Sequence, residues 1–147
     1  MSAQTAFLRW FEELDSSDVA IVGGKNASLG EVISELKEEG VRVPGGFATT
    51  ADAYRTFVEA NDIEEDMRGL LEGWQKNERS LQETGEAIRR LFRHGSFSEE
   101  IALAIREAYR QLSERYASEG SDKDGAPEVD VAARSSATAD SLDHHSS

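Results

Sequence analysis

Residues 20–31 read AIVGGKNASLGE, in which two glycines and a lysine separate two apolar patterns. The apolar residues 19–22 are mostly β-branched and run into Gly23 and Gly24, so the pattern predicts a strand that leads into a tight turn. Lys25 follows the turn directly. Because glycines let a backbone approach a phosphate and the start of a helix presents unpaired N–H groups, this combination is typical of an anion site.

Two interpretations of the turn stay open on the pattern alone. The residues do not match the phosphate loop G-x-x-x-x-G-K-[ST], because Val19 stands five positions before Gly24 and Asn26 follows the lysine. The glycines therefore either turn the chain beside a solvated Lys25 or place that lysine on a bound phosphate.

The residues after the turn predict a helix. Asn26 can cap its start and Gly40 supplies its stop. Its apolar face comprises Leu29, Val32, Ile33 and Leu36. Before the turn, residues 7–14 carry apolar side chains at a spacing that fits either a helix or a strand, and the type of this segment stays open.

Further elements are expected along the chain. Residues 41–44 predict a second short strand, and Thr49 or Thr50 then caps a helix that ends near Asn61. This helix is expected to bury Tyr54, Phe57 and Val58. Later helical patterns cover residues 63–75, 79–93 and 98–117. The apolar face of the last helix comprises Ile101, Ala104, Ile105, Ala108, Leu112 and Tyr116.

The C-terminal part of the sequence alternates between polar and apolar segments. The polar residues 118–127 predict a loop, and residues 143–147 predict a disordered tail. Between them, residues 129–133 predict a final strand that runs into Arg134.

The charge of the chain limits its partners. It carries 29 acidic and 16 basic residues, a net charge of -13, which argues against nucleic acid as a partner. Any phosphate site must therefore be a local cluster of cations and N–H groups. The four lysines are Lys25, Lys37, Lys76 and Lys123. An acidic, lysine-poor surface stays soluble in concentrated salt, so we hypothesise a salt-adapted source, and a melting series in KCl without stabilisation would contradict it.

Other residue counts exclude several kinds of site. The sequence contains no cysteine, which excludes disulfides, thiolate metal ligands and cysteine nucleophiles. It contains no long apolar stretch and no basic-then-apolar leader, so neither a membrane partner nor secretion is expected, and the cytoplasm is the expected location.

Three blocks of the sequence together resemble one known family. They read GGKNASLGE at 23–31, VPGGFATTADAY at 43–54 and ARSSATAD at 133–140. In this order and spacing they are similar to the N-terminal, ATP-binding part of the phosphoenolpyruvate synthase (pyruvate, water dikinase) family. Pyruvate phosphate dikinase and rifampicin phosphotransferase share this part, and ASLGE and FATT favour the synthase among them.

The resemblance implies a fold and a domain extent. It covers residues 6–142 and implies a helix-rich α/β domain that is part of an ATP-grasp-like nucleotide-binding domain. A few strands would then bring the glycine turn and Arg134 to a common edge, and the helices between residues 63 and 117 would form a bundle-like excursion on one side.

The resemblance also implies the residues of an ATP site. Lys25, Arg134 and Arg89 would hold the phosphates of ATP, because a guanidinium fork matches phosphate oxygens and a lysine adds a mobile point charge. Supporting positions would be Gly23, Gly24, Ser135, Ser136 and Thr138. The alternatives are that Arg89 pairs with surface glutamates and that the hydroxyl residues only cap a turn.

The family reaction needs more than this sequence contains. It converts ATP, pyruvate and water to phosphoenolpyruvate, AMP and phosphate through a phosphohistidine. The Mg2+ ligands and the phosphorylated histidine are expected in portions that the chain lacks, so no catalytic or metal-binding residue is assigned here. Three interpretations stay open: an inert N-terminal piece of a synthase, a stand-alone module that binds ATP or docks onto a synthase, and the same lobe of a related dikinase or antibiotic phosphotransferase.

Overall fold

A computed structural model describes residues 6–117 and 129–138 of the 147-residue chain. The chain divides into two compact units, one formed by residues 1–53 and 100–147 and the other by residues 54–99. We call them the first unit and the second unit. The described residues form several helices and one two-stranded sheet, so the expected helix-rich α/β class is confirmed in this coarse form.

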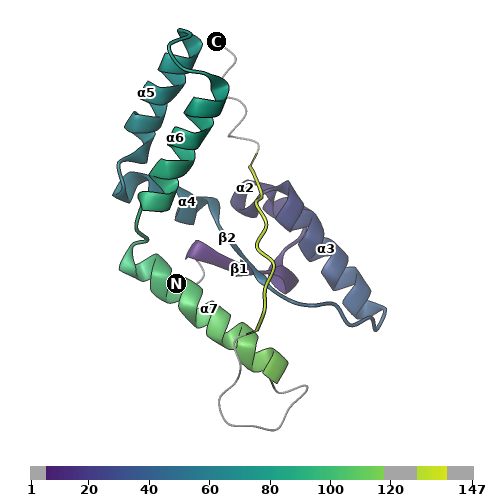
Figure 1. Cartoon of the computed structure of the whole chain (residues 1–147). Helices are drawn as coiled ribbons and strands as arrows, with labels where there is room; N and C mark the ends of the chain where they lie inside the picture. The colour runs from purple at the N-terminus through teal and green to yellow at the C-terminus, as the bar shows by residue number, and fades with distance from the viewer. Residues whose placement is uncertain (1–5, 118–128, 139–147) are drawn as a thin grey trace. The chain divides into compact units, whose positions relative to one another are not determined.

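The first unit contains both strands and the longest helix. Its elements are β1 (Leu8–Trp10), the 3-10 helices η1 (Phe11–Glu13) and η2 (Ser16–Asp18), α2 (Val19–Val22), α3 (Gly24–Glu38), β2 (Phe47–Thr49) and most of α7 (Glu99–Ala117). Most of α4 (Ala51–Ala60) together with α5 (Ile63–Gln75) and α6 (Leu81–His94) forms the second unit, as the labels in Figure 1 show.

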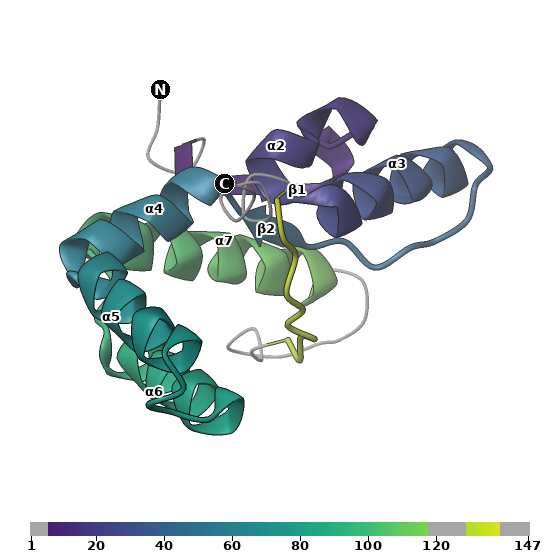
Figure 2. The same cartoon turned by 90° about the horizontal axis from the view of Figure 1, so that it is seen from above.

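The small sheet lies between helices of the first unit. Strands β1 and β2 pair antiparallel, with Trp10 opposite Phe47. On one face of the sheet, Leu8 and Trp10 pack with Ala108 and other residues of α7. On the other face, Ala48 packs with residues of α2 and α3. Figure 2 shows α3 and α7 on opposite sides of the two strands. Successive side chains of a strand point to opposite faces of the sheet, so the two strands separate two apolar layers.

The predicted strand at residues 19–22 is wrong, because this segment is the helix α2. A capping box precedes it: Asp15 accepts a hydrogen bond from the Ser17 amide at 2.7 Å, and the Asp15 amide donates to Asp18 at 3.0 Å. These bonds start a helical turn that continues through α2 and ends where the Gly23 amide donates to the Val19 carbonyl. The local cap outweighs the strand preference of the β-branched residues.

Helix α3 is confirmed, but its predicted cap is wrong. The helix begins at Gly24, one residue after the N-cap Gly23, which provides no side-chain bond. Asn26 lies inside the first turn, and its side-chain amide nitrogen Nδ2 donates a hydrogen bond to the Val22 carbonyl at 3.0 Å. Gly40 follows the helix with a φ of 78°, the left-handed conformation that favours glycine at a helix end. Val32, expected on the apolar face, is 48% exposed.

Two further strand predictions are wrong. Residues 41–44 form no strand, and the strand begins at Phe47 instead, because Pro44 has no N–H to donate to a ladder and the Gly45 amide donates to the Tyr116 hydroxyl. Residues 129–133 are irregular, because side chains of α7 rather than a strand bind the backbone of Val129.

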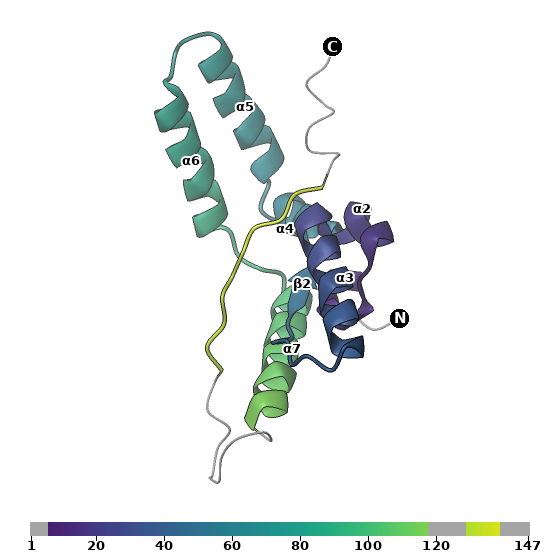
Figure 3. The same cartoon turned by 90° about the vertical axis from the view of Figure 1, so that its right-hand side faces the viewer.

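The second unit is a helical hairpin. Helices α5 and α6 match the predicted residues closely and lie side by side, as Figure 3 shows. Phe57 and Val58 of α4 and Ile63 of α5 form its apolar cluster. The expected burial of Tyr54 is wrong, since the residue is 54% exposed with one face of its ring stacked on Phe92.

The expected excursion of all helices between residues 63 and 117 is only partly right. The contact division places α5 and α6 in the second unit, whereas α7 belongs to the first unit almost entirely. Its buried residues Ala104, Ala108 and Leu112 pack on β1, which explains why α7 stays with the sheet.

The predicted cap of α4 is confirmed for Thr50, whose hydroxyl accepts a hydrogen bond from the Ala53 amide at 3.2 Å. The predicted loop at 118–127 and tail at 143–147 lie outside the described residues.

Candidate functional site

A groove of about 1110 Å³ opens in the first unit. Its walls come from α3, from residues 43–49, from the end of α7 and from residues 129–136. Much of the wall is apolar, and it includes Leu29, Ile33 and Val131. The groove is slightly larger than sites that bind drug-sized ligands, so a nucleotide fits by volume.

Helix α7 holds two of these walls in place. The hydroxyl of Tyr109 donates to the carbonyl of Val129, and the amide of Val129 donates to the Ser113 hydroxyl at 3.4 Å. One turn later, the hydroxyl of Tyr116 accepts a bond from the Gly45 amide. The helix therefore fixes the start of the 129–138 segment and the loop that precedes β2.

The glycine turn contacts the far end of the 129–138 segment. Gly23 has a φ of 85°, and its amide and carbonyl link α2 to α3. A Cβ atom added to Gly23 would lie 2.3 Å from the Ser136 hydroxyl and 2.8 Å from the Ala137 carbonyl oxygen. The residues that the sequence assigned to the turn and to the Arg134 segment are thus in direct contact.

Two of the predicted cations line the same groove. Lys25 comes from the first turn of α3 and Arg134 from the 129–138 segment, and both side chains are exposed. Within residues 6–117 and 129–138, neither of them forms a salt bridge. In a chain of net charge -13, such cations leave their charge available to an anionic ligand.

The predicted supporting residues surround these cations. Ser135 and Ser136 also line the groove, and Thr138 continues the same segment. The hydroxyl oxygen of Ser136 is buried and finds no hydrogen-bond partner among the described residues. A buried hydroxyl without a partner is costly, so we expect this oxygen to find a partner outside the described residues.

Two other arginines of the first unit, Arg110 and Arg115, have carboxylate partners. Arg110 binds both Glu107 and Glu114 along α7, and this hydrogen bond from Arg110 lowers the pKa of Glu107 to about 2. Arg115 lies 2.9 Å from Glu12 and over the ring of Trp10, 4.1 Å from its centroid. These pairs have structural roles, which distinguishes them from Lys25 and Arg134.

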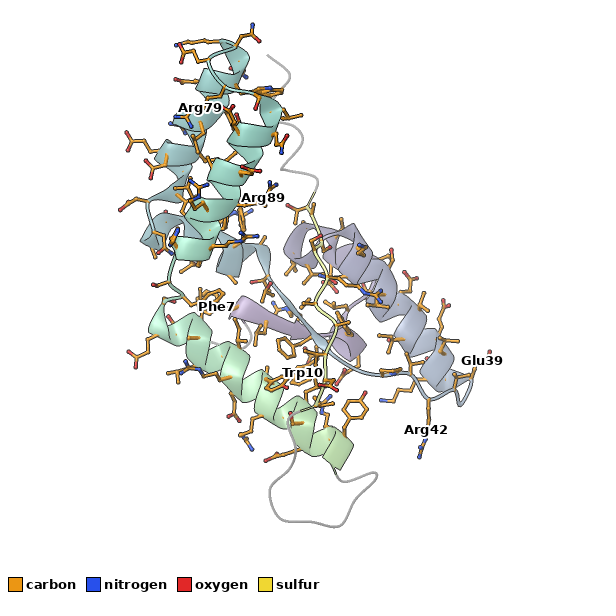
Figure 4. The ribbon with its side chains drawn as sticks, in the orientation of Figure 1. Phe7, Trp10, Glu39, Arg42, Arg79 and Arg89 are labelled. Atoms are coloured by element: carbon orange, nitrogen blue, oxygen red, sulfur yellow. The ribbon has the colours of Figure 1, made fainter. Side chains whose placement is uncertain are left out.

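The third predicted cation, Arg89, belongs to the second unit. It lies on α6, where Figure 4 labels it, and its Nη1 atom lies 3.3 Å from the position of a Cβ on Gly85. The alternative that Arg89 pairs with a surface glutamate finds no support, since no salt bridge involves it in the part of the chain that the structure describes. Its role at the ATP phosphates stays a prediction.

Sequence reasoning missed the residues that position the site. Tyr109, Ser113 and Tyr116 anchor the walls of the groove, and only Tyr116 was assigned to the apolar face of its helix. Their hydrogen-bond partners lie up to 71 residues away in sequence, so no local pattern could indicate them.

The described residues include neither a cluster of metal ligands nor a membrane-spanning helix. They contain no group of three or more His, Cys, Asp or Glu side chains that could hold a metal ion. No helix in the described ranges is long and apolar enough to cross a membrane.

Comparisons with known proteins match almost the whole chain. The family model of the pyruvate phosphate dikinase AMP/ATP-binding domain matches residues 19–147. A phosphoenolpyruvate synthase of Synechocystis sp. is 46% identical over 140 residues, which are 95% of this chain and 17% of that protein. The phosphoenolpyruvate synthase of Aquifex aeolicus is 41% identical over 93% of this chain and 15% of its own length. The phosphoenolpyruvate synthase of Neisseria meningitidis is 43% identical over 92% of this chain and 16% of its own length. The chain thus spans about a sixth of the length of these curated relatives.

Proposed function

The chain belongs to the family of the pyruvate phosphate dikinase AMP/ATP-binding domain, and from this premise we propose that the groove of its first unit holds the phosphates of ATP. Among the residues that line this groove, Lys25 and Arg134 are the cations that bind them. The observation that carries this proposal is that both residues line one groove from different elements and form no salt bridge within the described residues.

The chemistry of the groove supports a polyphosphate ligand. The guanidinium of Arg134 can bind two phosphate oxygens at once, and the ammonium of Lys25 can follow a group as it moves. The first turn of α3 adds backbone N–H groups and the positive end of the helix dipole. The hydroxyls of Ser135 and Ser136 supply further donors. An acidic surface elsewhere makes this local cluster the favoured place for an anion.

Arg89 is the third cation of the proposal, and it rests on the resemblance of the sequence alone. Its neighbour Arg90 provides a matched control on the same helix. Replacing Arg89 by alanine is expected to weaken ATP binding, whereas replacing Arg90 by alanine leaves it unchanged.

We propose that this site serves the phosphoryl transfer of a pyruvate, water dikinase. In that reaction ATP, pyruvate and water give phosphoenolpyruvate, AMP and phosphate through a phosphohistidine. The described residues of this chain would bind and orient ATP. Since they contain no group of metal ligands, Mg2+ would enter bound to the ATP phosphates, and the remaining ligands would come from other parts of a synthase.

Exposed apolar residues of the first unit favour a second proposal about partners. Val32, Val41 and Val131 are 48%, 48% and 58% exposed in the first unit. Exposed apolar residues of this kind are typical of surfaces that another polypeptide covers. The remainder of a synthase, or a complete synthase, is therefore the proposed macromolecular partner, and a related dikinase or antibiotic phosphotransferase is the alternative parent.

Calorimetric titration with MgATP tests the proposed site. We expect the unchanged chain to bind MgATP and the Lys25→Ala and Arg134→Ala variants each to bind it about 10-fold to 100-fold more weakly, because each removes a charge-assisted hydrogen bond. Lys37→Ala and Arg42→Ala serve as controls, since both residues are exposed in the first unit and do not line the groove.

The outcome separates the two interpretations of the cations. Equal affinity of Lys25→Ala and Lys37→Ala would show that Lys25 is simply solvated. The titrations should be run at low and high KCl, because phosphate contacts that depend on charge weaken as salt screens them.

A further inference from the structure

Asp130 is the one acidic residue among the described residues that line the groove of the first unit. It is exposed, and Lys25 and Arg134 line the same groove. The salt bridges and side-chain hydrogen bonds within residues 6–117 and 129–138 do not involve its carboxylate. A carboxylate repels a bound phosphate, so its place in this groove is favourable only if it faces a different part of the ligand.

The backbone places Asp130 at the part of the groove that α7 forms. Its neighbour Val129 is bound to α7 at both of its polar backbone groups. The Tyr109 hydroxyl donates to the Val129 carbonyl, and the Val129 amide donates to the Ser113 hydroxyl at 3.4 Å. Asp130 therefore follows directly on a residue that α7 fixes, and we call this part of the groove the α7 end.

The two cations lie toward the other end of the groove. Lys25 is in the first turn of α3. Ser136, two residues after Arg134, lies against Gly23, the N-cap of that helix. Figure 1 shows the yellow segment running from α7 toward α2 and α3. Four positions separate Arg134 from Asp130, which is at most about 14 Å of chain. The groove thus has a carboxylate at its α7 end and positive charge at the end that we call the α3 end.

The groups around Asp130 suit a nucleoside. Leu112, Tyr116 and Val131 also line the groove, and Val129 packs against the apolar cluster that contains Leu112. Apolar walls with few polar groups are typical of sites for ring systems such as a base. A carboxylate has two acceptor oxygens and no donor, so its partner must offer donors. The ribose of ATP offers two adjacent hydroxyl groups, which the two oxygens of one carboxylate can accept together.

We infer that Asp130 binds the ribose of ATP through both of its hydroxyl groups, with the nucleoside at the α7 end of the groove and the triphosphate at the α3 end. This inference rests on the proposed function and adds the orientation of the ligand. Asp130 also becomes a specificity residue, because its carboxylate favours a ligand with hydroxyl donors and repels a further phosphate at the α7 end.

Calorimetric titrations with three ligands test this role of Asp130. The ligands are the magnesium complexes of ATP, of 2′,3′-dideoxy-ATP and of tripolyphosphate. We expect the unchanged chain to bind ATP about 10-fold to 100-fold more tightly than dideoxy-ATP, because hydrogen bonds to a charged acceptor are lost. Asp130→Ala should lose this preference. It should bind tripolyphosphate at least as tightly as the unchanged chain does, since a like charge has been removed.

Glu31→Ala is the matched control for the change in charge. Glu31 is exposed on α3 and does not line the groove, so its replacement removes one negative charge from the first unit without touching the site. This variant should keep the preference for ATP over dideoxy-ATP. The thermal midpoint of each variant shows that it is folded.

Each other outcome overturns a defined part of the account. If the unchanged chain binds dideoxy-ATP as tightly as ATP, or if Asp130→Ala keeps the preference, the ribose contact is wrong while the proposed phosphate site stands. If Asp130→Ala loses affinity for tripolyphosphate as well, Asp130 acts at the phosphates or their magnesium and not at the ribose. If Glu31→Ala behaves like Asp130→Ala, the effect is one of net charge. If the unchanged chain, shown to be folded, binds neither ATP nor tripolyphosphate, the proposed function itself fails.

Discussion

Replacing Gly23 by alanine is expected to lower the free energy of unfolding by about 2–5 kcal/mol. The backbone there has φ 85° and ψ 158°, a region that is essentially restricted to glycine. The new methyl group would also lie 2.3 Å from the Ser136 hydroxyl and 2.8 Å from the Ala137 carbonyl oxygen. Both effects act at the joint between α2 and α3. Urea denaturation followed by circular dichroism measures the change.

A matched glycine separates the two causes. Gly40 has a φ of 78°, but a Cβ there would meet nothing within 4 Å. Gly40→Ala should therefore lower the free energy of unfolding only through backbone strain, by about 1–2 kcal/mol. Equal losses for the two variants would show that the contact between the turn and the Ser136 segment contributes nothing to stability.

Replacing Gly30 by alanine is expected to lower the free energy of unfolding by about 1–3 kcal/mol, although alanine favours helices. Gly30 lies inside α3, where an added Cβ would lie 2.5 Å from the Cβ of Leu14 and 2.8 Å from the Phe11 carbonyl oxygen. Backbone atoms of η1 would have to move away from α3. The same denaturation experiment measures the loss.

The control for Gly30 is an open helical glycine. Gly69→Ala in α5 meets no neighbouring atom, so it should stabilise the chain by about 0.5–1 kcal/mol through helix propensity. If Gly30→Ala stabilised the chain by a similar amount, the close packing of α3 on η1 would be contradicted.

The helices could be predicted from the sequence because their signals are local. The patterns of α5, α6 and α7 repeat over several turns, and Thr50 caps α4 as its position indicates. The strands could not be predicted in this way. Residues 19–22 have strand-forming side chains, yet the capping box at Asp15 commits them to a helix. Strand β2 is fixed by its pairing with β1, and no local pattern shows that pairing.

The sequence led to residues that line the groove, but it could not show how the groove is built. The resemblance pointed to Lys25 and Arg134, and both line the groove. It could not indicate that Tyr109 and Ser113 hold the start of the Arg134 segment, because these bonds join parts of the chain that are 16 to 20 residues apart in sequence. Nor could the pattern distinguish Gly23 from Gly24, which differ in φ and in the atoms around them.

The most direct test of the proposed ATP site is a residue-resolved NMR titration of the unchanged chain with MgATP. We expect the amide signals of Gly24, Lys25 and the 134–138 segment to shift together and to report one dissociation constant, because the proposal places them on two sides of one phosphate site. Lys37 and Gly40, at the far end of α3, should stay unchanged. Shifts confined to other residues, or none at millimolar MgATP, would contradict the proposal that this groove holds the phosphates of ATP.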